Sequence, residues 1–190
     1  MPTLIGVLAL QGAFQKHVES LSRLGVESRL VRKSAELDQC TGLIIPGGES
    51  TTMSLLIQQS GMYQPLQKFA ERSPVMGVCA GMILMAESVD DERVIPLNIL
   101  PFRALRNHYG RQVHSFTAEI ELDFDPGDEP LQAHFIRAPG VTDLGEGVDV
   151  LARYDDEIIV IGNDRHLALS FHPELTNDTR IHRYWLQHFS

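Results

Sequence analysis

Apolar runs alternate with helix-like segments through the first half of the chain. Residues 3–10 form a continuous apolar run, which is typical of a strand buried on both faces. Apolar residues then recur at steps of three and four up to Gly25, which predicts an amphipathic helix through Phe14, Val18, Leu21 and Leu24. The same patterns predict strands at 26–31, 42–46 and 75–78, and helices at 51–59 and 63–72. This alternation favours βαβ crossovers and a parallel sheet.

The second half of the chain changes to a period of two. Apolar residues alternate with polar ones from Phe116 to Phe124, as in a strand with one face in water. Further short strands are predicted at 134–138, 148–154, 157–161 and 167–171, and a helix at 180–189. Because their connections are short, these strands are expected to form antiparallel hairpins. The chain is thus predicted to be an α/β protein with a mixed, mostly parallel sheet, in a single domain over residues 1–190.

A candidate nucleophile, Cys79, stands where the strand at 75–78 turns into a helical segment. Gly77 and Gly81 flank it at two residues on each side. Small neighbours allow a sharp bend that lifts a side chain above the edge of a sheet. A helix N-terminus at that point favours the thiolate over the thiol. A buried structural cysteine is the alternative, but the two glycines and the change from strand to helix favour a nucleophile.

The candidate base for this cysteine is His172. It follows the apolar strand at 167–171, so it is expected at a strand end, where α/β proteins build their sites. Glu174 comes two residues later, and in extended backbone residues i and i+2 point the same way. Its carboxylate can therefore orient the imidazole and stabilise the imidazolium. An exposed His-Pro-Glu turn is the alternative interpretation of this tripeptide alone.

Acyl transfer also needs hydrogen-bond donors for an oxyanion. The N–H of Ala80, directly after the nucleophile, is one candidate. The second is expected in the loop at 46–50, where Gly48 can turn an N–H inward without a steric penalty. The same loop could be an ordinary turn. A phosphate-binding loop is disfavoured, because no lysine follows the glycines and no dinucleotide spacing is present.

Other polar residues give weaker signals. Arg106, directly after Leu105, and Arg137, within Phe135-Ile-Arg-Ala-Pro139, could hold or frame a polar substrate, although an arginine in a loop is more often a surface charge. Three histidines suggest metal, but their spacing fits no compact ligand set, and no metal site is expected: His108, His114 and His134. Cys40 has no flanking signature and is interpreted as structural.

Composition narrows the classes of function. The formal net charge of −9 disfavours a general nucleic-acid binder, which would need a basic face. No apolar run approaches the length of a membrane span, and the first residues have no basic region of a secretory signal. Two cysteines make neither a disulfide framework nor a zinc quartet. We therefore expect a cytoplasmic protein, where a thiol stays reduced and reactive.

With these residues in place, the chain resembles class I glutamine amidotransferases, and among them the glutaminase subunits of pyridoxal 5′-phosphate synthases. The glycine-flanked cysteine and His-Pro-Glu specify only the superfamily, whereas Gln11-Gly12, the extension after Glu49 and Phe135-Ile-Arg-Ala-Pro139 narrow it to these subunits. The matching stretches span nearly the whole chain in order: residues 5–12, 43–53, 77–81, 106–107, 110–113, 135–139 and 170–176.

The resemblance implies a three-layer α/β/α, flavodoxin-like fold. It also implies hydrolysis of L-glutamine to L-glutamate and ammonia by Cys79, His172 and Glu174, without a cofactor. The glutamine contacts that it implies fall on Gly48, Glu49, Ser50, Arg106, Ile136 and Arg137. The implied partner is the separate synthase subunit, a (β/α)₈ barrel that consumes the ammonia and activates the glutaminase on docking. His114 stands where the resemblance leads us to expect an acid.

Two other functions remain open on the residues alone. One is a different cysteine hydrolase on the same scaffold, such as a peptidase, which a panel of substrates would distinguish. The other is a non-catalytic binding or regulatory module that keeps only the fold. Loss of Cys79 or His172 would favour such a module, and both residues are present.

Overall fold

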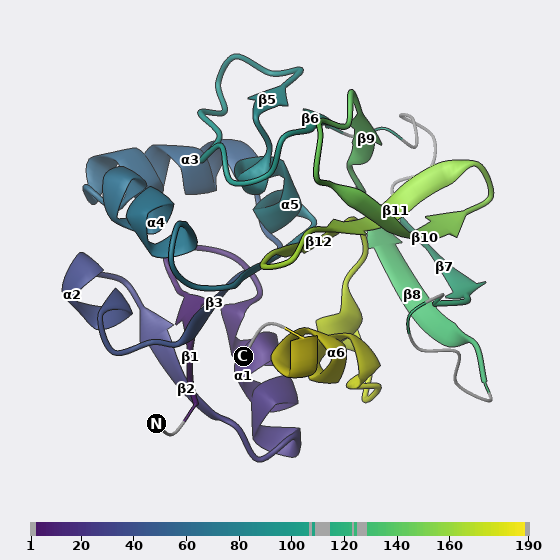
Figure 1. Cartoon of the computed structure of the whole chain (residues 1–190), viewed down its shortest axis with the longest axis horizontal. Helices are drawn as coiled ribbons and strands as arrows, with labels where there is room; N and C mark the ends of the chain where they lie inside the picture. Colours follow the sequence, from purple (N-terminus) through teal and green to yellow (C-terminus); the bar gives the residue numbers. More distant parts are fainter. Residues whose placement is uncertain (1–2, 107, 109–114, 123, 125–128, 189–190) are drawn as a thin grey trace.

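A mixed sheet forms the centre of the computed structural model, which describes residues 3–106, 108, 115–122, 124 and 129–188 (Figure 1). Within these residues seven strands pair in the order β10-β11-β12-β4-β3-β1-β2. The parallel part consists of β1 (Leu4–Leu8), β2 (Glu27–Val31), β3 (Gly42–Ile45), β4 (Val75–Val78) and β12 (Leu167–Leu169). Two strands continue it antiparallel, β11 (Glu157–Gly162) and β10 (Asp149–Tyr154). The predicted mixed and mostly parallel sheet is therefore confirmed.

Helices cover both faces of this sheet and make three layers (Figure 1). One face carries α2 (Ser34–Leu37), α3 (Ser50–Gln59), α4 (Tyr63–Ala70) and α5 (Ala80–Met85), and the other carries α1 (Phe14–Arg23) and α6 (Arg180–His188). Because successive strand residues point to opposite faces, Leu43 and Ile45 pack in the first apolar cluster, while Ile44 packs with Trp185 of α6 in the second. None of the described helices is long and apolar enough to cross a bilayer.

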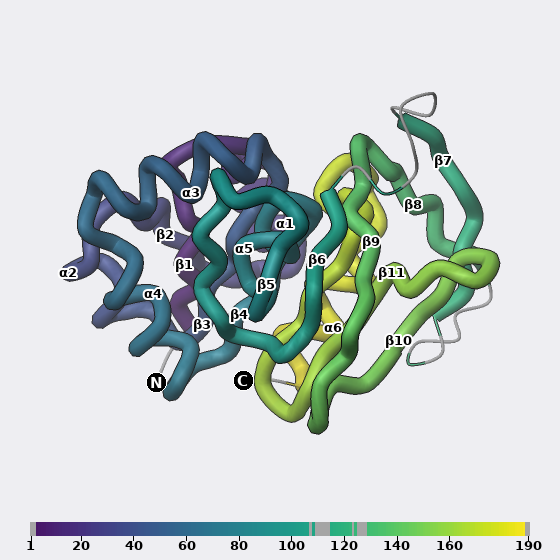
Figure 2. Tube along the Cα trace, turned by 90° about the horizontal axis from the view of Figure 1, so that it is seen from above, coloured from purple at the N-terminus to yellow at the C-terminus, as the bar shows by residue number. Residues whose placement is uncertain are grey.

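Two smaller sheets extend the fold beside the antiparallel edge (Figure 2). One contains β5 (Ser88–Val89), β6 (Arg103–Leu105) and β9 (Gly140–Thr142), and the other is the antiparallel pair of β7 (Ser115–Ile120) and β8 (Leu131–Ile136). Two of their strands end beside residues that the sequence predicts for the site. β6 ends directly before Arg106, and β8 ends at Ile136, directly before Arg137. These sheets therefore deliver to the site the side chains that the main sheet does not carry.

Several predicted boundaries are wrong in the second half of the chain. The strand predicted at 116–124 ends at Ile120, and the one predicted at 134–138 is Leu131–Ile136. The two segments pair antiparallel from Ser115↔Ile136 to Ile120↔Leu131. The ends of both strands are therefore set by this pairing and not by the alternation of residues along each segment. Five short elements were not predicted: α2, β5, β6, β9 and the 3₁₀ helix η1 (Pro173–Leu175). With two to four residues each, they are too short to show a period.

Candidate active site

Cys79 lies directly after β4, a strand in the middle of the sheet, and directly before α5. Its backbone has φ +51° and ψ −103°, outside the regions that non-glycine residues ordinarily occupy. The turn is held in place because the Cys79 N–H donates to the carbonyl of Leu169 on the neighbouring β12 at 2.8 Å. Backbone strain of this kind persists only where the surroundings enforce it, and it is concentrated at functional sites.

The flanking glycines make room for this turn. A Cβ atom on Gly81 would collide with the carbonyl of Ile45 on β3, and one on Gly77 would come within 2.8 Å of the Gly81 carbonyl. Helix α5 can therefore begin close against β3 and β4 only because these two positions carry no side chain. The predicted glycine-flanked bend is present, with all six residues of α5 buried behind it.

His172 reaches the same place from β12, which pairs in parallel with β4. Because the carboxyl ends of parallel neighbours meet at one edge of a sheet, His172 and Cys79 emerge side by side. The Nδ1 of His172 donates to Glu174 Oε1 at 2.7 Å, and both side chains are buried. The Cys79 side chain lines the same cavity as the imidazole and helps to raise its pKa. The structure thus brings together the three residues predicted as nucleophile, base and orienting acid.

The charged forms of His172 and Glu174 stabilise each other. Burial alone would lower the pKa of His172, but its interactions with Cys79 and Glu174 outweigh burial and raise this pKa to about 10. Burial alone would raise the pKa of Glu174, but the nearby His17 and the hydrogen bond from His172 lower it. The arrangement therefore favours an imidazolium between a carboxylate and the sulfur atom, which is the protonation state that a cysteine–histidine nucleophile uses.

A cavity of about 280 Å³ opens over Cys79. Among its lining residues are nine of those predicted from the sequence: Gly48, Glu49, Ser50, Cys79, Ala80, Arg106, Ile136, Arg137 and His172. Glu174 lies behind His172 and does not line it. Five further lining residues were not singled out as site residues: Gln11, Gly12, Ala13, Gly47 and Ile83. The sulfur atom of Cys79 also lies 3.7 Å from the carbonyl oxygen of Ile136.

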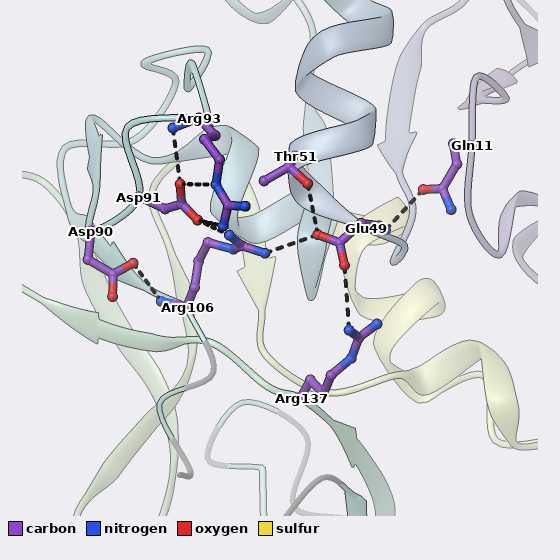
Figure 3. Close-up of polar contacts among 8 residues, drawn as sticks. All are labelled: Gln11, Glu49, Thr51, Asp90, Asp91, Arg93, Arg106 and Arg137. Carbon is purple, nitrogen blue, oxygen red and sulfur yellow. Dashed lines mark hydrogen bonds and ion pairs between the residues drawn. The ribbon is translucent and has the colours of Figure 1, made fainter. Parts of the chain in front are cut away.

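Glu49 occupies the centre of a charged network at this cavity (Figure 3). Its carboxylate accepts from Arg106 Nη2 at 3.0 Å and pairs with Arg137 Nη1 at 3.5 Å. Arg106 also forms an ion pair with Asp91, so its guanidinium is held between two carboxylates. The surface-charge interpretation of Arg106 is therefore wrong, because only 15% of its side chain is exposed. Arg137 is 56% exposed and stands in a left-handed conformation with φ +44°.

The loop at 46–50 is fastened to the loop that precedes α1. The N–H of Ala13 donates to the Gly47 carbonyl at 2.9 Å, and Gln11 Oε1 accepts from the Glu49 N–H at 3.0 Å (Figure 3). Gly12 has a φ of +103°, and a Cβ atom there would collide with the Gly47 carbonyl. Gly48 and Ala80 both line the cavity beside Cys79. Their role as oxyanion donors stays a prediction.

One further buried residue near the triad was missed. His17 of α1 has its Nε2 atom 3.7 Å from Glu174 Oε2, and its side chain is fully buried. The sequence carried a signal for it, because position 17 falls three residues after Phe14 and four before Leu21, on the apolar stripe of that helix. A histidine on such a stripe must be buried, and a buried imidazole needs polar partners.

The remaining candidates have other contacts. His108 bonds with Glu157 at 2.8 Å, and His134 bonds with Thr117 across the β7–β8 pair at 2.9 Å. His114 lies outside the described residues, as do Asn107 and the 110–113 motif. Within the described part of the chain, no group of three or more metal-binding side chains comes together. Burial raises the pKa of the Cys40 thiol, whose sulfur atom donates to the Glu36 carbonyl.

Comparisons with known proteins agree with this geometry. The model of the SNO glutamine amidotransferase family matches residues 7–190. Two curated relatives carry the name "Pyridoxal 5'-phosphate synthase subunit PdxT". The one from Desulforudis audaxviator is 45% identical and the one from Thermosipho africanus 47% identical, each over 183 residues and 96% of both chains.

Solved structures resemble the fold over nearly its whole length. One described as a glutamine amidotransferase has a TM-score of 0.89 and 43% identity, and covers 96% of this chain and 97% of its own. PurLQS from Thermotoga maritima has a TM-score of 0.74 at 18% identity, and covers 98% of this chain and 99% of its own. The second likeness concerns the fold alone.

Proposed function

The chain belongs to the SNO glutamine amidotransferase family, and on this premise we propose that its Cys79 site hydrolyses L-glutamine by a Cys–His–Glu triad. The observation that carries the proposal is the convergence of Cys79 with the His172–Glu174 pair at one cavity. These residues follow two different, parallel strands. Bringing them together requires a strained backbone at Cys79 and the burial of charged groups. The products are L-glutamate and ammonia.

The charged network supports an amino acid as the substrate. A free amino acid carries an ammonium and a carboxylate, and the cavity offers one carboxylate, Glu49, beside the guanidinium groups of Arg106 and Arg137. Arginine suits carboxylate recognition because its planar fork can donate two parallel hydrogen bonds. Gly48, Ser50 and Ile136 complete the proposed contacts on either side. The side-chain amide of glutamine would then extend toward Cys79.

The first chemical stage forms a thioester. The Cys79 sulfur attacks the carbon of the side-chain amide, and the negative charge on the amide oxygen is stabilised by the N–H groups of Gly48 and Ala80. His172 gives its proton to the amide nitrogen, which leaves as ammonia when the carbon–nitrogen bond breaks. Glu174 holds the imidazole in the tautomer and orientation that this transfer requires.

The second stage regenerates the enzyme. His172, now neutral, takes a proton from water as the water attacks the thioester carbon. The tetrahedral species collapses, the carbon–sulfur bond breaks, and L-glutamate leaves with the oxygen from water. The sulfur atom departs as a thiolate beside the newly formed imidazolium, which restores the starting charges.

The destination of the ammonia follows from the relatives, which are named as subunits of pyridoxal 5′-phosphate synthase. This chain supplies ammonia for the biosynthesis of pyridoxal 5′-phosphate, the coenzyme form of vitamin B6. We propose that it docks on a separate synthase subunit, a (β/α)₈ barrel, in the cytoplasm. The net charge of −9 supports a partner other than nucleic acid.

Glutamate release tests this function directly. Wild type, Cys79→Ala and Cys40→Ala are each assayed with L-glutamine, alone and with the barrel subunit of a pyridoxal 5′-phosphate synthase. We expect wild type and Cys40→Ala to release glutamate at similar rates when the barrel is present, and Cys79→Ala to release none. Retained activity in Cys79→Ala would overturn the mechanism. Cleavage of peptides without glutamate release would favour a peptidase instead.

A further inference from the structure

Two buried histidines lie behind the triad, on α1 and α6, the two helices that cover the same face of the main sheet. His17 of α1 has Nε2 3.7 Å from Glu174 Oε2, and its Nδ1 lies 3.0 Å from Nε2 of His182 on α6. Both imidazoles are fully buried, and Glu174 is 1% exposed. The groups thus continue the line from Cys79 through His172 and Glu174 into the buried interior.

The hydrogen bonds of these groups leave specific atoms unmatched. Glu174 Oε1 accepts from His172, whereas Glu174 Oε2 and His17 Nε2 have no hydrogen-bond partner among the described residues. Buried polar atoms are rarely left without a partner, and these two face each other. An N–H on His17 Nε2 would therefore point at the one carboxylate oxygen that the triad does not use.

The His17–His182 contact determines which nitrogen of His17 carries the proton. Burial lowers the pKa of His17, and it lowers the pKa of His182 to about 3, so both rings are neutral and each has one N–H. One of the two nitrogens in the 3.0 Å contact must donate. If His182 Nε2 donates to His17 Nδ1, the proton of His17 stands on Nε2, toward Glu174. The unpartnered His182 Nδ1 is then an acceptor, and unpaired acceptors are tolerated better than unpaired donors.

We propose that His17 is a positioning residue that directs an N–H at the second oxygen of Glu174, and that His182 sets the tautomer of His17. This inference rests on the proposed glutaminase function. Held at both oxygens, the Glu174 carboxylate cannot rotate away from His172. The imidazole of His172 in turn keeps the orientation in which it exchanges a proton with Cys79 and the substrate.

Rigid elements hold the pair in place. Helix α1 packs against η1, and Arg23 at its end donates to the carbonyl of Thr176, just beyond η1, at 3.1 Å. His17 and Glu174 therefore keep their spacing as one packed unit. Neither His17 nor His182 lines the cavity over Cys79. Their loss should change the chemical step and leave the binding of glutamine unchanged.

Two amide substitutions separate positioning from a merely structural role. The amide nitrogen of His17→Gln reaches about as far from the backbone as Nε2 and can still donate to Glu174. That of His17→Asn reaches only as far as Nδ1. With the barrel subunit present, we expect His17→Gln to stay within about threefold of the wild-type kcat. We expect His17→Asn to lose about 10- to 100-fold in kcat with KM unchanged, as for other residues that orient a catalytic ligand. His182→Phe should lose less than His17→Asn.

A second readout needs no turnover of glutamine. The rate at which iodoacetamide alkylates Cys79, followed by mass spectrometry of its peptide, reports on the Cys79–His172 pair, with the buried Cys40 as internal reference. We expect a slower rate in His17→Asn and an unchanged rate in His17→Gln. Melting temperatures of the two variants show whether each folds.

Two outcomes overturn the proposal, and a third concerns the function instead. Equal kcat values for His17→Gln and His17→Asn, whether both normal or both low, would assign His17 a structural role only. An equal alkylation rate of Cys79 in the two variants would do the same. Wild type that releases no glutamate with the barrel present would contradict the proposed function, while the alkylation rates would still test the positioning of Glu174.

Discussion

Cys79 and His172 reach the same cavity by different means. Cys79 is placed by its own neighbours: a strand, two glycines and a short helix, all within a few residues of the chain. His172 also follows a strand, but its partner Glu174 lies beside His17 of α1, which is far away in the sequence and in turn contacts His182 of α6. The nucleophile is therefore positioned mainly by steric constraints on its own turn, with one backbone hydrogen bond to β12, and the base by polar contacts between side chains.

This difference predicts how each half of the site fails. A steric constraint fails when an atom is added, because the turn that presents Cys79 no longer fits between β3 and α5. A polar chain fails when a donor or acceptor is removed, because a buried charge then loses its partner while the packing stays nearly intact. Four predictions test this contrast, from the largest expected effect to the smallest.

The largest effect is expected for His172→Gln. This change keeps the volume of the side chain but removes the proton shuttle, and we expect kcat to fall by roughly 10⁴-fold or more. Steady-state glutamate release with the barrel subunit measures it. His134→Gln, on the β7–β8 pair, is the matched control and should keep full activity. A fall of less than tenfold in His172→Gln would contradict the role of the imidazole.

Gly81→Ala tests the steric half of the site. Its new methyl group would collide with the backbone carbonyl of Ile45, which cannot move without distorting β3. We expect a loss of about 3 kcal/mol in the free energy of unfolding, together with loss of activity. Gly61→Ala is the control, because its φ of +70° disfavours alanine but nothing lies within 4 Å of the added Cβ atom. That variant should lose only about 1 kcal/mol. Urea unfolding that gives equal losses would contradict the steric account.

Arg106→Gln tests substrate binding in the cavity that the nucleophile and the base share. We expect KM for glutamine to rise by roughly 10- to 100-fold, since a charge-assisted hydrogen bond contributes about 1.5–3 kcal/mol, with a much smaller change in kcat. Arg103→Gln, at the exposed start of the same strand, serves as the control. An unchanged KM in Arg106→Gln would separate this arginine from the substrate and limit its role to pairing with Glu49 and Asp91.

The smallest effect is a pH dependence of stability. Because the pKa of His172 is raised from 6.5 to about 10 on folding, its stabilising contribution is complete below about pH 6.5 and is lost as the pH rises toward 10. The pKa of Glu174 is lowered, so its contribution is present above its ordinary value of 4.5 and is lost as the pH falls through the lower one. We expect Tm of the wild type to fall by a few degrees between about pH 6.5 and 10, and His172→Gln to show a flatter profile. Parallel profiles for the two proteins would contradict the shift.

The contrast between the nucleophile and the base also explains which features the sequence predicts well. The bend at Cys79 is encoded by adjacent residues, and the strands and helices of the first half follow from clear periods, so the structure agrees with those predictions. The family resemblance is likewise confirmed by the match over residues 7–190. That His172 and Cys79 meet depends on β12 pairing with β4, which the chain order does not reveal by itself.

Other features escaped prediction for physical reasons. The pairing of His17 with Glu174 requires α1 to pack on η1, which is a tertiary contact between segments without a shared pattern. The delivery of Arg106 and Ile136 by β6 and β8 was missed because β6 has only three residues and the ends of β8 are set by its partner β7. Local periodicity carries no information about such contacts.

A covalent intermediate tests the central claim, that Cys79 and His172 act together on glutamine, most directly. Wild type and His172→Gln are mixed with the barrel subunit and L-glutamine, quenched in acid during turnover, and analysed by peptide mass spectrometry. We predict one added glutamyl group on the Cys79 peptide of the wild type, none on the Cys40 peptide, and none on either peptide of His172→Gln. Glutamate release without an adduct on Cys79, or an adduct that forms equally fast in His172→Gln, would contradict the account.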